Sequence, residues 1–87
     1  MRDQTKQIPN DHERRVQRAV VAQTLRDDHD RCWPRAELEA ELGEPDALAI
    51  NDALALLEME GVIELQGEIV QASRAALHLD RLEMIAL

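Results

Sequence analysis

Aromatic residues are almost absent from this chain of 87 residues, which has one tryptophan, Trp33, and no phenylalanine or tyrosine. The length allows one domain, and its core must be built from aliphatic side chains packed between helices, with Trp33 as the largest anchor. The single cysteine, Cys32, cannot form an internal disulfide bond. We expect it to pack as a small apolar side chain beside Trp33.

Membrane-related segments are also lacking. No apolar stretch approaches the roughly 20 residues that cross a bilayer. Residues 1–10 contain two basic side chains but no apolar run, so they do not have the pattern of a secretory signal. We therefore expect a cytoplasmic protein, with residues 1–10 as a flexible N-terminal arm and residues 11–87 as a single domain.

Basic residues become scarce after residue 35. Residues 1–35 hold eight basic and six acidic side chains, whereas residues 36–87 hold two basic and twelve acidic ones, within a net charge of −8. Such a chain does not bind nucleic acid by bulk attraction, because binding requires cations that displace the counterions around phosphates. Any contact with DNA is expected to come from the first third of the chain.

The first predicted helix runs from about Asp11 to Asp28. Asn10 or Asp11 can cap its start, and Glu13 lies three residues after Asn10 in the manner of a capping box. Its apolar side is predicted to consist of Val16, Ala19, Val20 and Leu25.

Two more helices follow a polar connector at residues 27–31. The residue before a proline avoids the α conformation, so Cys32 and Trp33 are predicted to form a short extended piece before Pro34. Pro34 then opens a helix that buries Leu38 and Leu42 and ends at Gly43, and a further helix runs from Asp46 to about Glu60 before Gly61.

A hairpin and a last helix complete the pattern. The β-rich runs at residues 62–65 and 68–71 are separated by Gln66 and Gly67, the length of a two-residue hairpin loop. Ser73 can cap a helix from Arg74 to about Ile85 within the C-terminal segment 73–87. The spacing of apolar residues predicts that Ala75, Leu79, Leu82 and Ala86 face the core.

Three stretches resemble the winged helix-turn-helix superfamily, and in particular small actinobacterial-type regulators: Trp33 to Leu38, Ala53 to Ile63, and Gly67 to Ala76. The resemblance covers about residues 11–82. It implies an α+β, mostly helical fold, namely a winged helix with a three-helix core, a short strand, a β-hairpin wing and a C-terminal helix. In that superfamily the third helix usually enters the major groove of DNA and the wing touches the backbone.

The third helix has the wrong chemistry for reading DNA. At about 100° per residue, Ile50, Leu54 and Leu57 form its core side. A DNA reader would carry Arg, Asn, Gln or Ser on the opposite side. This chain instead places there Leu48, Asp52, Ala55 and Met59.

The charge of the third helix and the wing also argues against DNA binding by these elements. The third helix has no Lys or Arg, Asn51 is its one familiar base-reading side chain, and the wing adds Glu64 and Glu68. The apolar residues of the outer side are either scattered surface side chains or the centre of a protein-facing groove with an acidic rim. We favour the groove, whose partner is a basic protein or a second copy of the chain.

The basic residues Arg14, Arg15 and Arg18 lie on one face of the first helix by their spacing. A cluster of this size is usually a solvated face paired with acids. If the protein contacts DNA, we expect these arginines to do so, together with Arg2 and Lys6 of the N-terminal arm and with Asn51.

Apolar residues lie on more than one side of the last helix. One stripe is expected to pack on the first helix, and a second stripe with Leu77 and Met84 either contacts another subunit or belongs to a frayed end. The resemblance favours a homodimer, because winged-helix regulators often dimerise through terminal helices.

Catalytic and metal-binding patterns are not found in the sequence. His29 and Cys32 lie near three aspartates, but zinc sites usually need four ligands and more regularly spaced Cys and His. There is no nucleophile elbow, phosphate loop or dinucleotide fingerprint. We therefore predict no enzyme, no metal and no cofactor, but a transcription-regulator-type protein that acts mainly through protein contacts, with sequence-specific DNA binding as the alternative.

Overall fold

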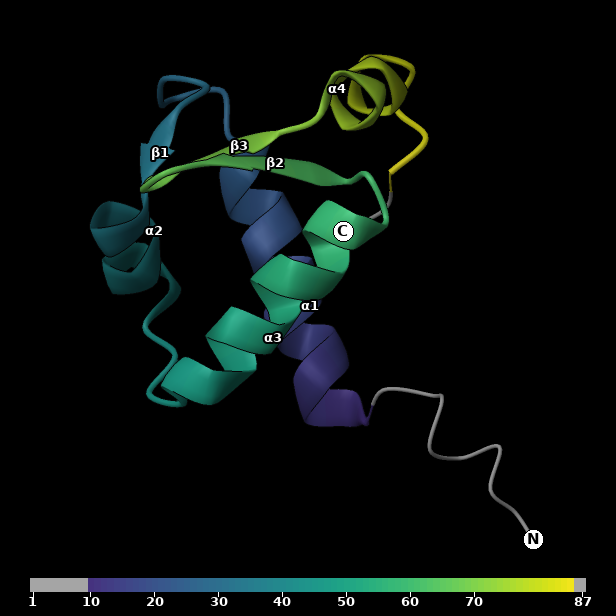
Figure 1. The fold of residues 1–87 in the computed structure, drawn as a ribbon. Coiled ribbons are helices and arrows are strands. Elements are labelled where there is room, and N and C mark those ends of the chain that lie inside the picture. Colours follow the sequence, from purple (N-terminus) through teal and green to yellow (C-terminus); the bar gives the residue numbers. More distant parts are fainter. Residues whose placement is uncertain (1–9, 86–87) are drawn as a thin grey trace, which may run out of the picture.

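The computed structural model describes residues 10–85 and has an α+β fold with four helices and one small antiparallel sheet within them. The sheet order is β1-β3-β2, and the sheet lies across one end of α1 and α3 (Figure 1). In chain order the elements are α1 (Asp11–Thr24), β1 (Trp33–Pro34), α2 (Arg35–Leu42), α3 (Ala47–Met59), β2 (Ile63–Gln66), β3 (Ile69–Ala72) and α4 (Arg74–Arg81).

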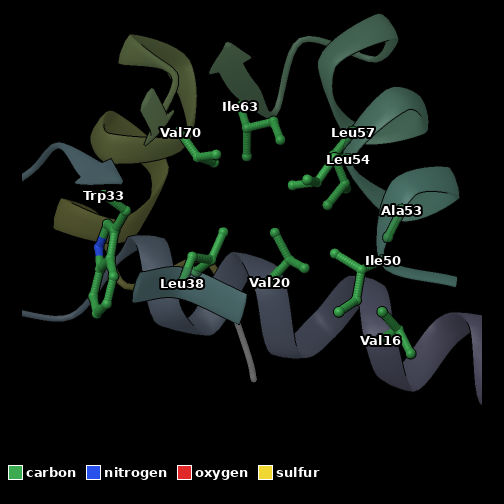
Figure 2. Close-up of a cluster of buried hydrophobic side chains, with 10 residues drawn as sticks. All are labelled: Val16, Val20, Trp33, Leu38, Ile50, Ala53, Leu54, Leu57, Ile63 and Val70. Atoms are coloured by element: carbon green, nitrogen blue, oxygen red, sulfur yellow. The ribbon is translucent and has the colours of Figure 1, made fainter. Parts of the chain in front are cut away.

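The hydrophobic core fills the space between α1, α3 and the inner face of the sheet (Figure 2). Trp33 is buried in it, as predicted for the only aromatic side chain. Burial of these aliphatic side chains is the main stabilising contribution in a domain with so few aromatic residues. The core cluster consists of Val16, Val20, Trp33, Leu38, Ile50, Ala53, Leu54, Leu57, Ile63 and Val70.

Helix α1 begins as predicted and ends earlier. The side chain of Asn10 accepts a hydrogen bond from the Glu13 amide, and the Glu13 side chain accepts one from the Asn10 amide, which completes the capping box. The predicted end at Asp28 is wrong, because Leu25 already caps the helix and the chain turns at residues 27–28. Residues 1–9, which make up most of the predicted N-terminal arm, lie outside the described residues.

The buried side of α1 differs from the prediction at Ala19, Thr24 and Leu25, of which Leu25 is half-buried and follows the helix. Ala19 is exposed, and Thr24 is buried in line with Val16 and Val20. A spacing of four residues keeps a narrow stripe against α3, whereas Ala19 lies beside that stripe. The Thr24 hydroxyl is satisfied because it donates to the carbonyl oxygen of Val21 at 2.9 Å.

The sheet is shifted by one residue relative to the sequence prediction. The short first strand is Trp33–Pro34, and the hairpin loop is Gly67-Glu68 instead of Gln66-Gly67. Trp33 pairs with Val70, and the amide of Arg35 donates to the carbonyl oxygen of Glu68 at 2.7 Å. Gly67 has a φ of 58°, which a glycine adopts readily, so it takes the first position of the loop.

Cys32, which precedes β1, is exposed, so the expectation that it packs in the core is wrong. Side chains alternate across a strand, and Trp33 takes the inward position. The Cys32 thiol donates instead to Oε1 of Gln71 at 3.3 Å.

Helix α4 is shorter than predicted and presents another side to the core. Ala76 is buried, whereas Ala75, Leu79 and Leu82 are exposed. Its start is fixed by Ser73, which is buried and whose amide donates to the carbonyl oxygen of Val62 at 2.9 Å. Because this anchor sets the rotation of the helix, the predicted stripe turns outward; Ala86 lies outside the described residues.

Candidate functional site

Helix α3 separates its two sides as the sequence predicts. The side chain of Asp46 caps it by accepting from the Ala49 amide at 3.1 Å, and Gly61 follows its end with a φ of 80°. The side that carries Ile50 and Leu54 is buried in the core. The opposite side is exposed along its whole length and consists of Leu48, Asp52, Ala55 and Met59, which we call the α3 ridge.

The two large apolar residues of the α3 ridge are among the most exposed in the described chain. Leu48 is 68% exposed and Met59 is 74% exposed. Asp52 lies between them, and Glu58 and Glu60 are exposed near Met59. The ridge therefore combines two large exposed apolar side chains with an acidic border.

A cation from another element, Arg35 of α2, lies beside α3. Nη2 of Arg35, at the start of α2, donates a hydrogen bond to Oδ1 of Asn51. The same guanidinium donates through Nε to Oε2 of Glu39 at 2.7 Å. Asn51, the predicted base-reading residue, is thus already engaged, and the charge of Arg35 is compensated.

The hairpin has an acidic side chain in its loop and another in its first strand. Glu68 is exposed in the two-residue loop. Glu64 is opposite Gln71 across the sheet and accepts a hydrogen bond from its side-chain amide at 3.0 Å. Neither residue offers a cation to a phosphate group.

The three arginines of α1 lie together, as predicted. Arg14, Arg15 and Arg18 are exposed and line one hollow with Asp11. Arg14 is paired with Asp11, with Nη2 3.1 Å from Oδ1. No acid within residues 10–85 forms an ion pair with Arg15 or Arg18. Among the described residues, these two are therefore the arginines of α1 whose charge no acid compensates.

Leu77 and Met84 do not form the single stripe that was predicted. Leu77 is half-buried and lines a shallow hollow between α4 and the end of α1. Met84 is 68% exposed but lies beyond the end of α4. Glu83, with a φ of 57°, turns the chain between them, so the two side chains leave the helix in different directions.

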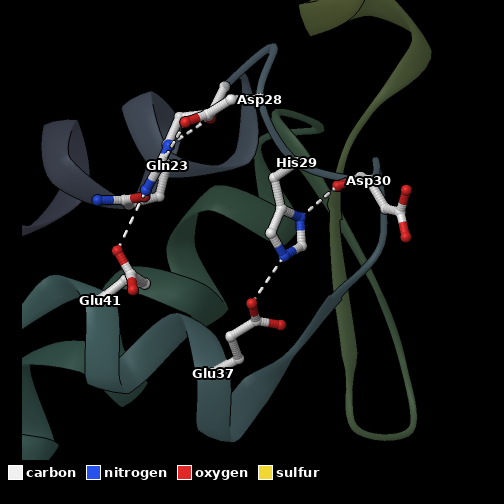
Figure 3. Close-up of polar contacts among 7 residues, drawn as sticks. Gln23, Asp28, His29, Asp30, Glu37 and Glu41 are labelled. Carbon is white, nitrogen blue, oxygen red and sulfur yellow. Dashed lines mark hydrogen bonds and ion pairs between the residues drawn. The ribbon is translucent and has the colours of Figure 1, made fainter.

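The polar connector between α1 and β1 holds a cluster of contacts around Trp33. The His29 ring stacks on Trp33 with 3.5 Å between ring centroids. Nδ1 of His29 lies 2.6 Å from the carbonyl oxygen of Asp30, and Nε2 lies 2.9 Å from Oε2 of Glu37 (Figure 3). We call His29, Trp33, Glu37 and Arg26 the tryptophan cluster.

Both partners of the His29 ring are hydrogen-bond acceptors. Only the doubly protonated imidazolium can donate to both at once. The contact with the Asp30 carbonyl chiefly raises the pKa of His29; partial burial opposes this shift, and the Glu37 carboxylate adds to it. The sequence offered a weak signal for this arrangement, because His29 is near the only aromatic residue.

Arg26 completes the tryptophan cluster. Its guanidinium carbon lies 5.8 Å from the centre of the Trp33 ring, within the range of a cation–π contact. It also binds Asp28 at 2.8 Å and Glu41 at 3.2 Å, and it lowers the pKa of Asp28. The end of α1 is thereby linked to α2.

Within residues 10–85, no group of three or more His, Cys, Asp or Glu side chains is arranged to hold a metal ion. In the same part of the chain, the helices fall short of the length and apolar character that a membrane span requires. No family model, curated protein or solved structure matches this chain.

Proposed function

We propose that this chain is a non-enzymatic winged-helix protein of the transcription-regulator type that works mainly through protein contacts or homodimerisation. The observation that carries the proposal is the α3 ridge, on which Leu48 and Met59 are exposed on either side of Asp52. The order of helices and strands, with α2 and α3 before a two-stranded hairpin, supports the winged-helix assignment. In that fold α3 is the helix that usually meets DNA.

The chemistry of the ridge favours protein over DNA. A DNA-facing helix needs cations for the phosphates and polar side chains for the base edges. Arg35 is the cation beside α3, and its guanidinium is shared between Asn51 and Glu39. The ridge therefore suits a partner with an apolar centre and a basic border.

DNA binding through α1 is the alternative, and the grouping of Arg14, Arg15 and Arg18 around one hollow is the observation that favours it. The two functions are separated by titrating the protein against a labelled mixed-sequence duplex at low salt. We expect no saturable binding in the micromolar range. Saturable binding that weakens steeply with salt and is lost in Arg14→Glu/Arg15→Glu/Arg18→Glu would replace our proposal with the DNA alternative.

The protein-contact function is tested by Leu48→Asp and Met59→Asp. Sedimentation and binding measurements on these variants should show loss of self-association or of partner binding, with the fold retained. Leu79→Asp, which changes an exposed leucine on α4, is the matched control and should behave as the wild type. If both ridge variants associate as the wild type does, the ridge is not the contact surface.

A further inference from the structure

A hollow of about 300 Å³ lies between α1 and the connection from α2 to α3. Its apolar lining comes from Val16, Ala19 and Leu42, and its polar lining from His12, Arg15 and Glu44. We call it the α1 hollow. The apolar half of this lining is suited to receive one apolar side chain, and the polar half to contact a polar neighbour of that side chain.

The polar edge of the α1 hollow has a positive side. Oε2 of Glu44 accepts a hydrogen bond from the Asp46 amide at 3.0 Å and lies 3.5 Å from Nε2 of His12, so the acid of this edge is already engaged. Arg15 has no ion-pair partner among the described acids, and Arg18 follows it by three residues on the same face of α1. An incoming carboxylate would therefore meet two accessible guanidinium groups.

The first half of the α3 ridge is the chemical complement of this hollow. Leu48 projects from the first turn of α3, and Asp52 follows one turn later on the same side. An apolar side chain next to a carboxylate matches an apolar hollow next to two arginines. Packing and charge would thus fix the same relative position of the two surfaces.

Both surfaces lie at the same end of the molecule, away from the sheet. Figure 1 shows the first half of α1 and the start of α3 at this end. His12 joins the two, because its Nε2 also lies 4.0 Å from Oδ2 of Asp46, the residue that caps α3. About a two-fold axis, Leu48 of each copy can therefore enter the α1 hollow of the other copy, which gives a closed dimer.

We propose that the α1 hollow of one copy binds Leu48 of a second copy, with Asp52 paired to Arg15 and Arg18 across the dimer interface. This inference rests on the proposed protein-binding role of the α3 ridge and names its partner. Unlike a contact between two α3 ridges, it requires α1 of the partner.

A charge exchange tests this pairing. Asp52→Arg should oppose the partner's arginines, and Arg15→Glu/Arg18→Glu should oppose the partner's Asp52, so each variant alone should dimerise at least about tenfold more weakly. An equimolar mixture should form a heterodimer, because both contacts are then complementary. Dimerisation is measured by sedimentation equilibrium. The control is Arg74→Glu/Arg81→Glu on α4, which changes the net charge by the same amount as Arg15→Glu/Arg18→Glu.

A neutral variant separates shape from charge. Ala19→Gln fills the α1 hollow without changing charge and keeps a good helix former on α1, so we expect weaker dimerisation at unchanged stability. A circular dichroism melt of each variant confirms that it is folded.

Two outcomes overturn the inference. If Arg15→Glu/Arg18→Glu dimerises as the wild type while Leu48→Asp does not, the ridge binds another surface, and the proposed function stands without this pairing. If the wild type is monomeric at every accessible concentration, the pairing is absent, and the proposed function is then decided by its own DNA titration.

Discussion

The tryptophan cluster and the α3 ridge both place an acidic side chain near a large apolar one, but for opposite purposes. In the cluster, charged side chains surround a buried aromatic ring, and each makes a short contact with another element. On the ridge, large apolar side chains are exposed next to an acid, and no contact within the described residues requires them there. The cluster therefore holds the fold together, whereas the ridge is available for a partner.

This difference teaches that contacts with other elements, and not residue type, mark the two roles. The sequence alone would suggest that His29 and Glu37 are solvated surface residues, but the contact between them fixes the connector against α2. Leu48 would pass for a core residue, yet it is outside the core. Substitutions in the two regions should therefore separate stability from binding.

The largest expected loss of stability is that of Trp33→Ala. Removing the largest core side chain should lower the free energy of unfolding by about 3 to 5 kcal/mol, which is a large part of the stability of a small domain. Chemical denaturation followed by circular dichroism measures this change.

Trp33→Phe is the control for that experiment. Nε1 of Trp33 is buried without a hydrogen-bond partner in the described structure, so phenylalanine should retain most of the apolar contact at no cost in hydrogen bonds. If alanine and phenylalanine lower the free energy of unfolding equally, the indole nitrogen has a hydrogen-bond partner, and apolar contact alone does not explain the stabilisation by Trp33.

A smaller effect that depends on pH is expected from His29. Its pKa is raised in the folded state, so its contribution to stability is complete below the ordinary histidine pKa of about 6.5 and is lost as pH rises through the folded pKa. Relative to wild type, His29→Gln should therefore be less stable in mildly acidic buffer, and the difference should shrink toward pH 8. Thermal melts across this range measure it.

Glu37→Gln sharpens the same prediction. It keeps the shape of the side chain but removes the carboxylate that lies 2.9 Å from Nε2 of His29. The pH dependence should become weaker but should not disappear, because the Asp30 carbonyl remains. A difference between wild type and His29→Gln that grows with pH would contradict the assignment of an imidazolium.

Much of the fold follows from local signals in the sequence. Capping side chains mark three helix starts: the Asn10 and Glu13 pair, Asp46 and Ser73. Glycines mark two helix ends, at Gly43 and Gly61. These signals act within one turn, so they survive without knowledge of the tertiary structure. The α3 ridge was predictable for the same reason, because helical spacing alone places its members on one side.

The errors arose where distant segments decide the structure. The hairpin register depends on pairing with Trp33, and the rotation of α4 depends on the hydrogen bond from Ser73 to Val62. The contacts of His29 with Trp33 and of Arg35 with Asn51 join separate elements, which no periodicity reports. Spacing within one segment could not have identified them.

The smallest expected effect on stability is that of the ridge variants. Leu48→Asp and Met59→Asp should change the free energy of unfolding by no more than about 0.5 kcal/mol, because both side chains are already largely in water. Leu54→Ala, on the buried side of the same helix, should cost about 2 to 5 kcal/mol. Parallel denaturation curves test this contrast, and a large loss for Leu48→Asp in the monomer would mean that the ridge is part of the folding core. If Leu48→Asp instead lowers stability only where the protein self-associates, the exposed side of α3 contributes to binding and its buried side to folding.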